Sequence, residues 1–218
     1  MEILAQIFET MINGIYDFTG DYGVAIVGIT LIIRACMVPL NIKQRAQMKK
    51  QKEISVQIEQ LKAKYGKNQK KLNEELQKVY EKNPTGIGGC ILPFLQLPVM
   101  YGLYQAIRMV AMAGATTVLL PWVASILMRD HMLILPIATL FVQILPQTYP
   151  YLRFFKDLEL QKASVPSIAV ILLTNSLFVF AIPSGLGLYY FVSGLFTAFE
   201  QLIVNLVEVR KRKGVVAA

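Results

Sequence analysis

An arginine inside an apolar run is the residue of this chain with the clearest chemical consequence. Arg34 lies within "GITLIIRACMVPLNIKQR", residues 28 to 45, a stretch of transmembrane character. A charged side chain near the bilayer centre costs at least about 3 kcal/mol, so such residues usually face a partner or water. On a helix, Thr30, Arg34 and Asn41 fall within about 40° of one another. One face of this segment is therefore expected to be polar.

Polar side chains also occur inside the other apolar segments. They are Gln96, then Thr139, Gln143 and Gln147, then Thr174 and Asn175, and finally Ser193, Thr197 and Glu200. Because unpaired polar groups are costly in hydrocarbon, we expect these residues to face one another or a water-filled cavity. The pattern predicts a hydrophilic groove within a helix bundle. For single residues such as Thr139, Thr174 or Ser193, hydrogen bonding between helices, worth about 0.6 kcal/mol, is an alternative role.

Glu200 is a candidate partner for Arg34. Both residues lie about eight residues from the cytoplasmic ends of their segments, at which depth their charged groups cannot readily reach the surface. An ion pair between them would remove much of the positive charge of the groove. The pairing is a hypothesis that the sequence leaves open.

Residues for catalysis or metal binding are sparse. The single histidine, His131, follows Asp130 in a loop, and no Gly-x-Ser-x-Gly motif surrounds Ser184 or Ser193. One histidine and two separated cysteines, Cys36 and Cys90, do not form a plausible zinc site, and no phosphate-binding loop occurs. We expect no enzymatic activity, no metal and no cofactor.

The elements that must position these residues are membrane spans. The 218 residues are 55% hydrophobic and carry a net charge of +8, a combination that predicts an all-α polytopic membrane protein. Five runs approach the roughly 20 apolar residues that cross a bilayer. These predicted transmembrane helices span residues 22 to 42, 88 to 112, 131 to 147, 165 to 182 and 185 to 207.

The distribution of positive charge predicts the orientation of these spans. Most of the 22 Lys and Arg residues fall in three segments, residues 43 to 84, 148 to 164 and 208 to 218. Because short cytoplasmic loops carry the Lys and Arg excess, these segments are assigned to the cytoplasm. The N-terminus is then outside the cell and the C-terminus inside it.

The remaining segments have distinct characters. Residues 1 to 20 have the spacing of an amphipathic helix on the outer surface. Residues 43 to 84 form a predicted basic helical hairpin, with "YGKN" at its turn, that suits anionic lipids or ribosomal RNA. Residues 113 to 130, broken by Pro121 and carrying Trp122, are predicted to be an outer interfacial loop. Residues 148 to 164 form a cytoplasmic loop, and residues 208 to 218 form a basic tail.

Several ordered motifs resemble the YidC/Oxa/Alb family of membrane protein insertases over nearly the whole chain. "ITLIIRACMVPLNIKQ" resembles the first core span and "GGCILPFLQLPVMYGLY" the second. "LPW" followed by "ILPIATLFVQ" resembles the outer loop and third span, and "PSGLGLYYFVSGLFTAFEQ" resembles the last. The short form, without a large extracytoplasmic domain, is similar to Gram-positive bacterial members.

The resemblance implies five transmembrane helices around a hydrophilic groove that is open to the cytoplasm and to lipid. Arg34 matches the groove arginine, Thr30 the threonine one turn before it, and Tyr190 a tyrosine at the substrate-contact region. Gln96 fits a polar groove position in the second span. Glu200 departs from the family pattern, in which this side chain is more often uncharged.

The function implied is insertion and folding of newly made membrane proteins in the bacterial plasma membrane. Implied partners are nascent membrane proteins, the ribosome, the signal recognition particle machinery and the Sec translocon, with the protein active as a monomer. A small transporter or channel is the alternative, although paired inverted repeats are missing from the sequence. A chaperone that helps spans pack without inserting them is a third reading, and Arg34 discriminates it from an insertase.

Overall fold

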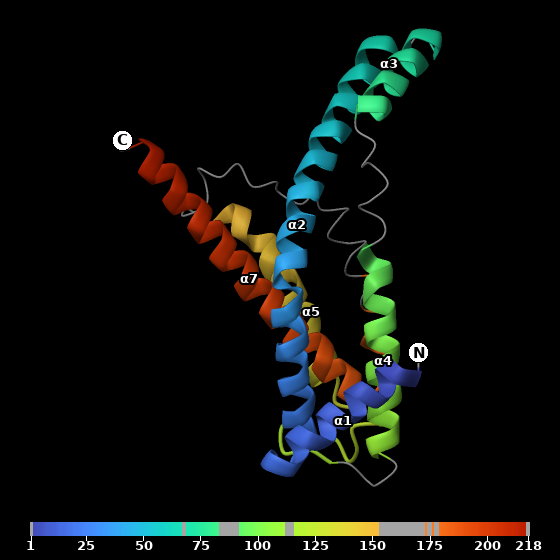
Figure 1. Cartoon of the computed structure of the whole chain (residues 1–218), viewed down its shortest axis with the longest axis vertical. Coiled ribbons are helices and arrows are strands. Elements are labelled where there is room, and N and C mark those ends of the chain that lie inside the picture. Colours follow the sequence, from blue (N-terminus) through green and yellow to red (C-terminus); the bar gives the residue numbers. More distant parts are fainter. Residues whose placement is uncertain are drawn as a thin grey trace. The chain divides into compact units, whose positions relative to one another are not determined.

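All the elements seen in the computed structural model of this chain are helical (Figure 1). The structure describes residues 2–66, 69–82, 92–111, 116–152, 173, 176 and 179–216. The chain divides into two compact units, residues 1–35 with 101–218, and residues 36–100. The predicted span at 165 to 182 lies largely outside the described residues.

The first two helices meet at a glycine turn. Helix α1 (Glu2–Thr19) buries Phe8 and Ile12 and exposes Ile3 and Phe18. Gly20, at φ 68°, closes this helix by donating its N–H to the Tyr16 carbonyl at 2.7 Å. Left-handed backbone of this kind is accessible to glycine at little cost, so the chain can reverse direction before the next helix.

Helix α2 (Tyr22–Tyr65) is continuous across the position where the sequence predicted a span to end and a hairpin to begin. The composition changes at Lys43, but Lys, Gln, Arg, Ala and Met all favour helices, so the polar stretch extends the apolar one. Pro39 lies inside this helix and cannot donate a backbone hydrogen bond to Ala35. The boundary between the two units falls at Ala35 and Cys36, one turn before this proline.

Two helices among the described residues are long and apolar enough to cross a membrane. They are residues Tyr22–Gln44 of α2, with mean hydropathy 2.1, and residues Ser184–Arg210 of α7 (Ser184–Val216). Only 28% and 22% of the residues in their most apolar windows are buried, whereas the core helix of a soluble protein is mostly buried. Both helices therefore present apolar surface outward, as membrane spans do.

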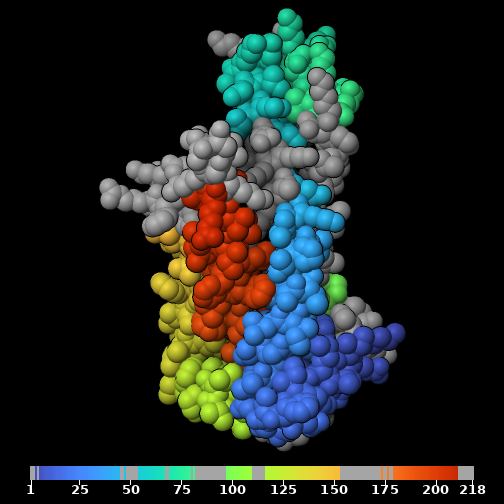
Figure 2. All heavy atoms as spheres, turned by 60° about the vertical axis from the view of Figure 1, so that its left-hand side comes forward, coloured from blue at the N-terminus to red at the C-terminus, as the bar shows by residue number. Residues whose placement is uncertain are grey.

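Helix α4 (Leu92–Ala111) lies within the predicted span at 88 to 112, and helix α5 (Ile134–Thr148) matches the predicted span at 131 to 147 except that it ends one residue later. Helix α5 packs along α7, and the two lie side by side in Figure 2. The contact is close because α7 presents glycines: a Cβ at Gly187 would lie 2.9 Å from Leu135 Cδ2, and one at Gly194 would lie 3.0 Å from Val142 Cγ1. Small residues at helix contacts let membrane helices approach closely.

Both ends of the α5 and α7 pair are fixed by hydrogen bonds. At one end the N–H groups of Ser184 and Gly185 each donate at 2.8 Å to the Met128 and Ile126 carbonyls. At the other, the 3-10 turn η2 (Tyr149–Tyr151) follows α5, and the buried Tyr149 hydroxyl donates to the Ala198 carbonyl at 2.9 Å. Burial raises the pKa of this phenol. These bonds hold α5 and α7 in one register.

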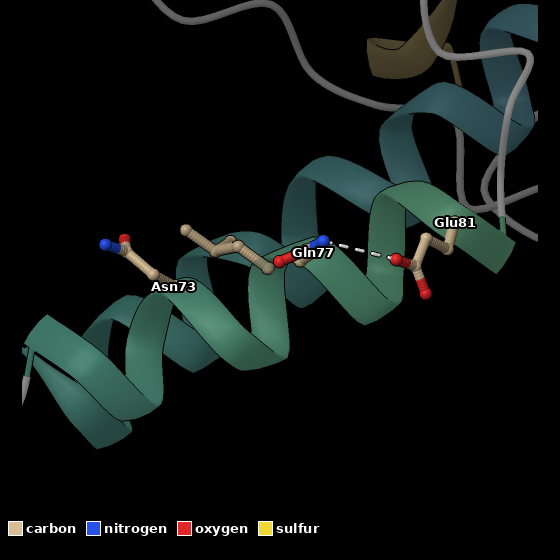
Figure 3. A pocket seen from close by; sticks show the side chains of 4 residues that line it. Asn73, Gln77 and Glu81 are labelled. Atoms are coloured by element: carbon tan, nitrogen blue, oxygen red, sulfur yellow. Dashed lines mark hydrogen bonds between the residues drawn. The ribbon is translucent and has the colours of Figure 1, made fainter.

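In the second unit, α3 (Gln69–Lys82) lies beside the last turns of α2 (Figure 1). Leu72 of this helix is buried. The helix also bears a hollow lined by Asn73, Leu76, Gln77 and Glu81, in which Gln77 Nε2 donates to Glu81 Oε1 at 3.3 Å (Figure 3). The lining side chains among the described residues all belong to this one helix.

Candidate functional site

Thr30 and Arg34 occupy successive turns of α2 in the first unit. Thr30 is completely buried, and its hydroxyl donates to the Ile26 carbonyl at 2.6 Å. Arg34 is half-buried, and its Nε has no hydrogen-bond partner among the described residues although the atom itself is buried. A buried guanidinium nitrogen without an acceptor is costly, so this position is suited to receive an acceptor from another molecule or from water.

Helix α7 contributes Tyr190 and Ser193. The charge of Arg34 acts electrostatically on the half-buried Tyr190, which places these two predicted site residues near one another. Ser193, one turn further along α7, is buried, and its Oγ has no hydrogen-bond partner within the described part of the chain. The sequence identified Ser193 as polar but did not select it, because a single serine in a span often serves only as a hydrogen-bonding group between helices.

Gln143 and Glu200 also belong to the first unit. Gln143 is half-buried on α5 and lies beside Gly194 of α7, since a Cβ at that glycine would be 3.9 Å from Gln143 Cγ. Glu200 is buried on α7. The pairing of Arg34 with Glu200 stays a prediction. Restoration of folding by Arg34→Glu combined with Glu200→Arg would support it.

The other predicted site residues lie in the second unit or outside the described side chains. Asn41 is half-buried on α2 in the second unit. Gln96 lies on α4 in the same unit, and its side chain is outside the description. Thr174 and Asn175 lie outside the described residues. The roles of Asn41 and Gln96 therefore stay predictions.

Asp21 anchors a loop to the start of α2, a role that the sequence reading missed. Its Oδ1 accepts hydrogen bonds from the Val24 N–H and the Thr117 hydroxyl, both at 2.8 Å, and its Oδ2 accepts from the Val118 N–H at 2.6 Å. Burial raises the carboxyl pKa, but these hydrogen bonds outweigh it, and the pKa of Asp21 is lowered from the usual 3.8. An aspartate directly before a helix is a capping signal, which could have indicated part of this role.

Asp130 anchors the loop that precedes α5 to the start of that helix. Its Oδ1 accepts from the Trp122 indole N–H at 3.1 Å and the Met132 N–H at 2.9 Å, and its Oδ2 accepts from the Leu135 N–H at 2.7 Å. The carboxylate is 5% exposed. The adjacent His131 is exposed, and the described residues contain no group of metal-ligating side chains. Asp130 is therefore an organising residue of this loop.

Among the described residues, two helices of spanning length with outward apolar surface accompany polar side chains held inside the first unit, an arrangement that fits a helical membrane protein. Comparisons with known proteins identify the class further. Residues 14–211 match the family model described as 60Kd inner membrane protein. The chain is 32% identical over 204 residues to the membrane protein insertase YidC of Caldanaerobacter subterraneus subsp. tengcongensis, covering 93% of this chain and 94% of that protein.

Longer relatives match over the same region. The membrane protein insertase YidC of Wolinella succinogenes is 31% identical over 213 residues, and that of Bordetella petrii is 32% identical over 211 residues. This chain spans 37% and 35% of their respective lengths. The chain belongs to the YidC/Oxa/Alb family of membrane protein insertases, which are non-enzymatic membrane chaperones.

Proposed function

We propose that this protein inserts newly made membrane proteins, and helps them fold, through a hydrated groove that opens within the membrane. In the first unit the groove is lined by Arg34, Thr30, Gln143, Tyr190 and Glu200. The short polar tail of a substrate would enter this groove, where water and polar side chains replace the hydration that hydrocarbon cannot supply. Its apolar segment would move into lipid, driven by burial of its own surface.

The single observation that supports this proposal is the environment of Arg34. Its Nε is buried and has no acceptor within the described structure, and its charge acts on Tyr190 of another helix. Charge attraction is stronger at reduced dielectric than in bulk water, so a guanidinium here would attract acidic residues of a substrate tail. Ser193 Oγ, also buried and without an acceptor or donor in the described residues, adds a second polar atom that a substrate could bond.

The orientation of the protein in the membrane and its cytoplasmic partners are also part of this proposal. Five spans, with the N-terminus outside and the C-terminus in the cytoplasm of a bacterial cell, would expose the basic hairpin to anionic lipid headgroups. The ribosome, the signal recognition particle machinery and the Sec translocon are the proposed partners of this side, and the protein works alone or with the translocon. Asn41 and Gln96 are proposed as further polar positions.

The test is insertion of a small membrane protein with an acidic N-terminal tail into liposomes that contain only this protein. Insertion is scored by protection of the tail from protease. We expect protection above that of empty liposomes, with Arg34→Ala reducing it for acidic tails more than for neutral tails. Arg129→Ala is the matched control, because Arg129 is an exposed arginine of the outer loop and should leave protection unchanged.

Two other results would count against the proposal. Equal protection in empty liposomes, with a folded preparation, would mean that this protein does not insert that substrate alone, and would favour a chaperone or a translocon-dependent role. Equal loss for acidic and neutral tails in Arg34→Ala would mean that the arginine supports folding and does not attract substrate charge.

A further inference from the structure

The loop between α4 and α5 exposes an unusual set of apolar side chains. The exposed large hydrophobic residues between positions 116 and 133 are Val118, Leu119, Met128, Met132 and Leu133, which we call the outer loop face. Val118 is 83% exposed and Met132 64%. The same loop buries Leu120, Val123 and Ile126 inward. The loop thus has two apolar faces, and only one of them is covered by the described protein.

The backbone N–H groups of the outer loop face are already hydrogen-bonded inside the protein. The Val118 N–H donates to Asp21 Oδ2 at 2.6 Å and the Leu119 N–H to Thr117 Oγ1 at 3.1 Å. The Met128 N–H donates to the Ser125 carbonyl at 2.9 Å. The Met132 N–H donates to Asp130 Oδ1 at 2.9 Å, and the Leu133 N–H to the Asp130 carbonyl at 3.3 Å. Each of the five residues that expose an apolar side chain therefore has a bonded N–H.

Exposed apolar side chains together with internally bonded N–H groups are expected of a surface that contacts lipid more than of one that contacts water. In water an exposed N–H can bond to solvent, so no internal acceptor is needed. In hydrocarbon each unsatisfied N–H costs several kcal/mol, and internal bonding is required. Leu133 even adopts a left-handed backbone at φ 57°, an unfavourable conformation for leucine that coincides with its bond to Asp130.

We propose that the outer loop face is a membrane-inserted surface whose partner is the acyl chains just beneath the outer-leaflet headgroups. The face continues into the exposed Ile134, Ile137 and Phe141 of α5, a helix proposed to span the membrane. In Figure 2 the loop lies at the end of the first unit where α5 begins. Arg129 and His131 are exposed between these apolar residues, and such side chains can reach headgroups from a shallow position.

Insertion of the loop would affect the lipid beside the protein as well as the protein itself. The carboxylates of Asp21 and Asp130 accept hydrogen bonds from N–H groups of the loop. These N–H groups therefore need no water as an acceptor. An irregular segment inserted at this depth displaces outer-leaflet lipid beside α5 and α7, without adding another full span. The choice of the outer leaflet rests on the orientation proposed above, whereas insertion of the loop does not.

Site-directed fluorescence in liposomes tests this proposal. Cys36 and Cys90 are replaced by serine, and an environment-sensitive dye is attached at Met132→Cys. The lipid control is Phe141→Cys, 68% exposed on α5, and the aqueous control is Gln69→Cys, exposed on α3. We expect the Met132 dye to match the Phe141 dye in its blue-shifted emission and in quenching by lipids brominated along the acyl chain.

Each alternative outcome is distinguishable. Emission and aqueous quenching like those of the Gln69 dye would overturn the proposal. A blue-shifted emission without quenching by brominated lipid would mean that protein, such as a second copy of the chain, covers the face, and would also overturn it. Failure of the Phe141 control to report lipid would contradict the proposed span instead. Unaltered substrate insertion by the labelled proteins separates this result from that of the groove.

Discussion

The Thr117 hydroxyl donates a hydrogen bond of 2.8 Å to Asp21 Oδ1, although the two residues are 96 positions apart in the chain. The contact joins the start of α2 to the loop that follows α4. A Cβ at Gly23 would clash with Thr117 Oγ1, so glycine is the residue that fits there. The carboxylate thus locates one end of the helix that carries Arg34.

We predict that Thr117→Val destabilises the protein by about 1.5–3 kcal/mol, because a hydrogen bond to a buried charged group is lost. Thermal unfolding in detergent measures the change. Thr116→Val is the matched control, since Thr116 is the exposed neighbour and should have little effect. In an Asp21→Asn background the cost of Thr117→Val should shrink. Equal costs in both backgrounds would show that the two side chains are not coupled.

A second prediction concerns acid. Because the folded pKa of Asp21 is lowered below the ordinary 3.8, its contribution to stability is fully present above that value. The contribution is lost as the pH falls through the lowered folded pKa. We expect Asp21→Asn to be less stable than the natural protein at about pH 6, and the difference to shrink toward about pH 3. An undiminished difference at acid pH would contradict the role of the ionised carboxylate.

The sequence predicted the helical class and the family because apolar run lengths and ordered motifs are properties of the linear chain. Arg34 and Thr30 were assigned to one helical face in the same way, and both lie on α2, but their roles in a groove stay predictions. The continuity of α2 was not predicted, because the change in charge at Lys43 resembles a boundary although helix propensity does not change there. The loop anchors at Asp21 and Asp130 depend on contacts between distant segments, which a single sequence does not reveal.

A third prediction concerns the packing of α5 against α7. Gly194→Ala should destabilise the protein by about 1–3 kcal/mol, because the new methyl would lie 3.0 Å from Val142 Cγ1. Val142→Ala in the same protein should recover part of this loss by making room. Gly14→Ala is the control, since a Cβ there would meet no side chain or distant backbone atom of the described residues within 4 Å, and the change favours helix. Thermal unfolding of the three variants measures these effects, and equal melting of Gly194→Ala and Gly14→Ala would contradict the close contact.

The last prediction uses the single tryptophan of the chain as a reporter. Asp130→Ala removes the acceptor of the Trp122 indole N–H and of the Met132 and Leu135 N–H groups, so these donors, of which the Leu135 N–H is buried, lose that partner. We expect a loss of at least about 1–3 kcal/mol and a changed Trp122 emission spectrum in the folded protein. Asp17→Ala, at an exposed aspartate of α1, should change neither property. Unchanged Trp122 emission in Asp130→Ala would mean that the loop is held by its apolar contacts alone, and the carboxylate would lose its organising role.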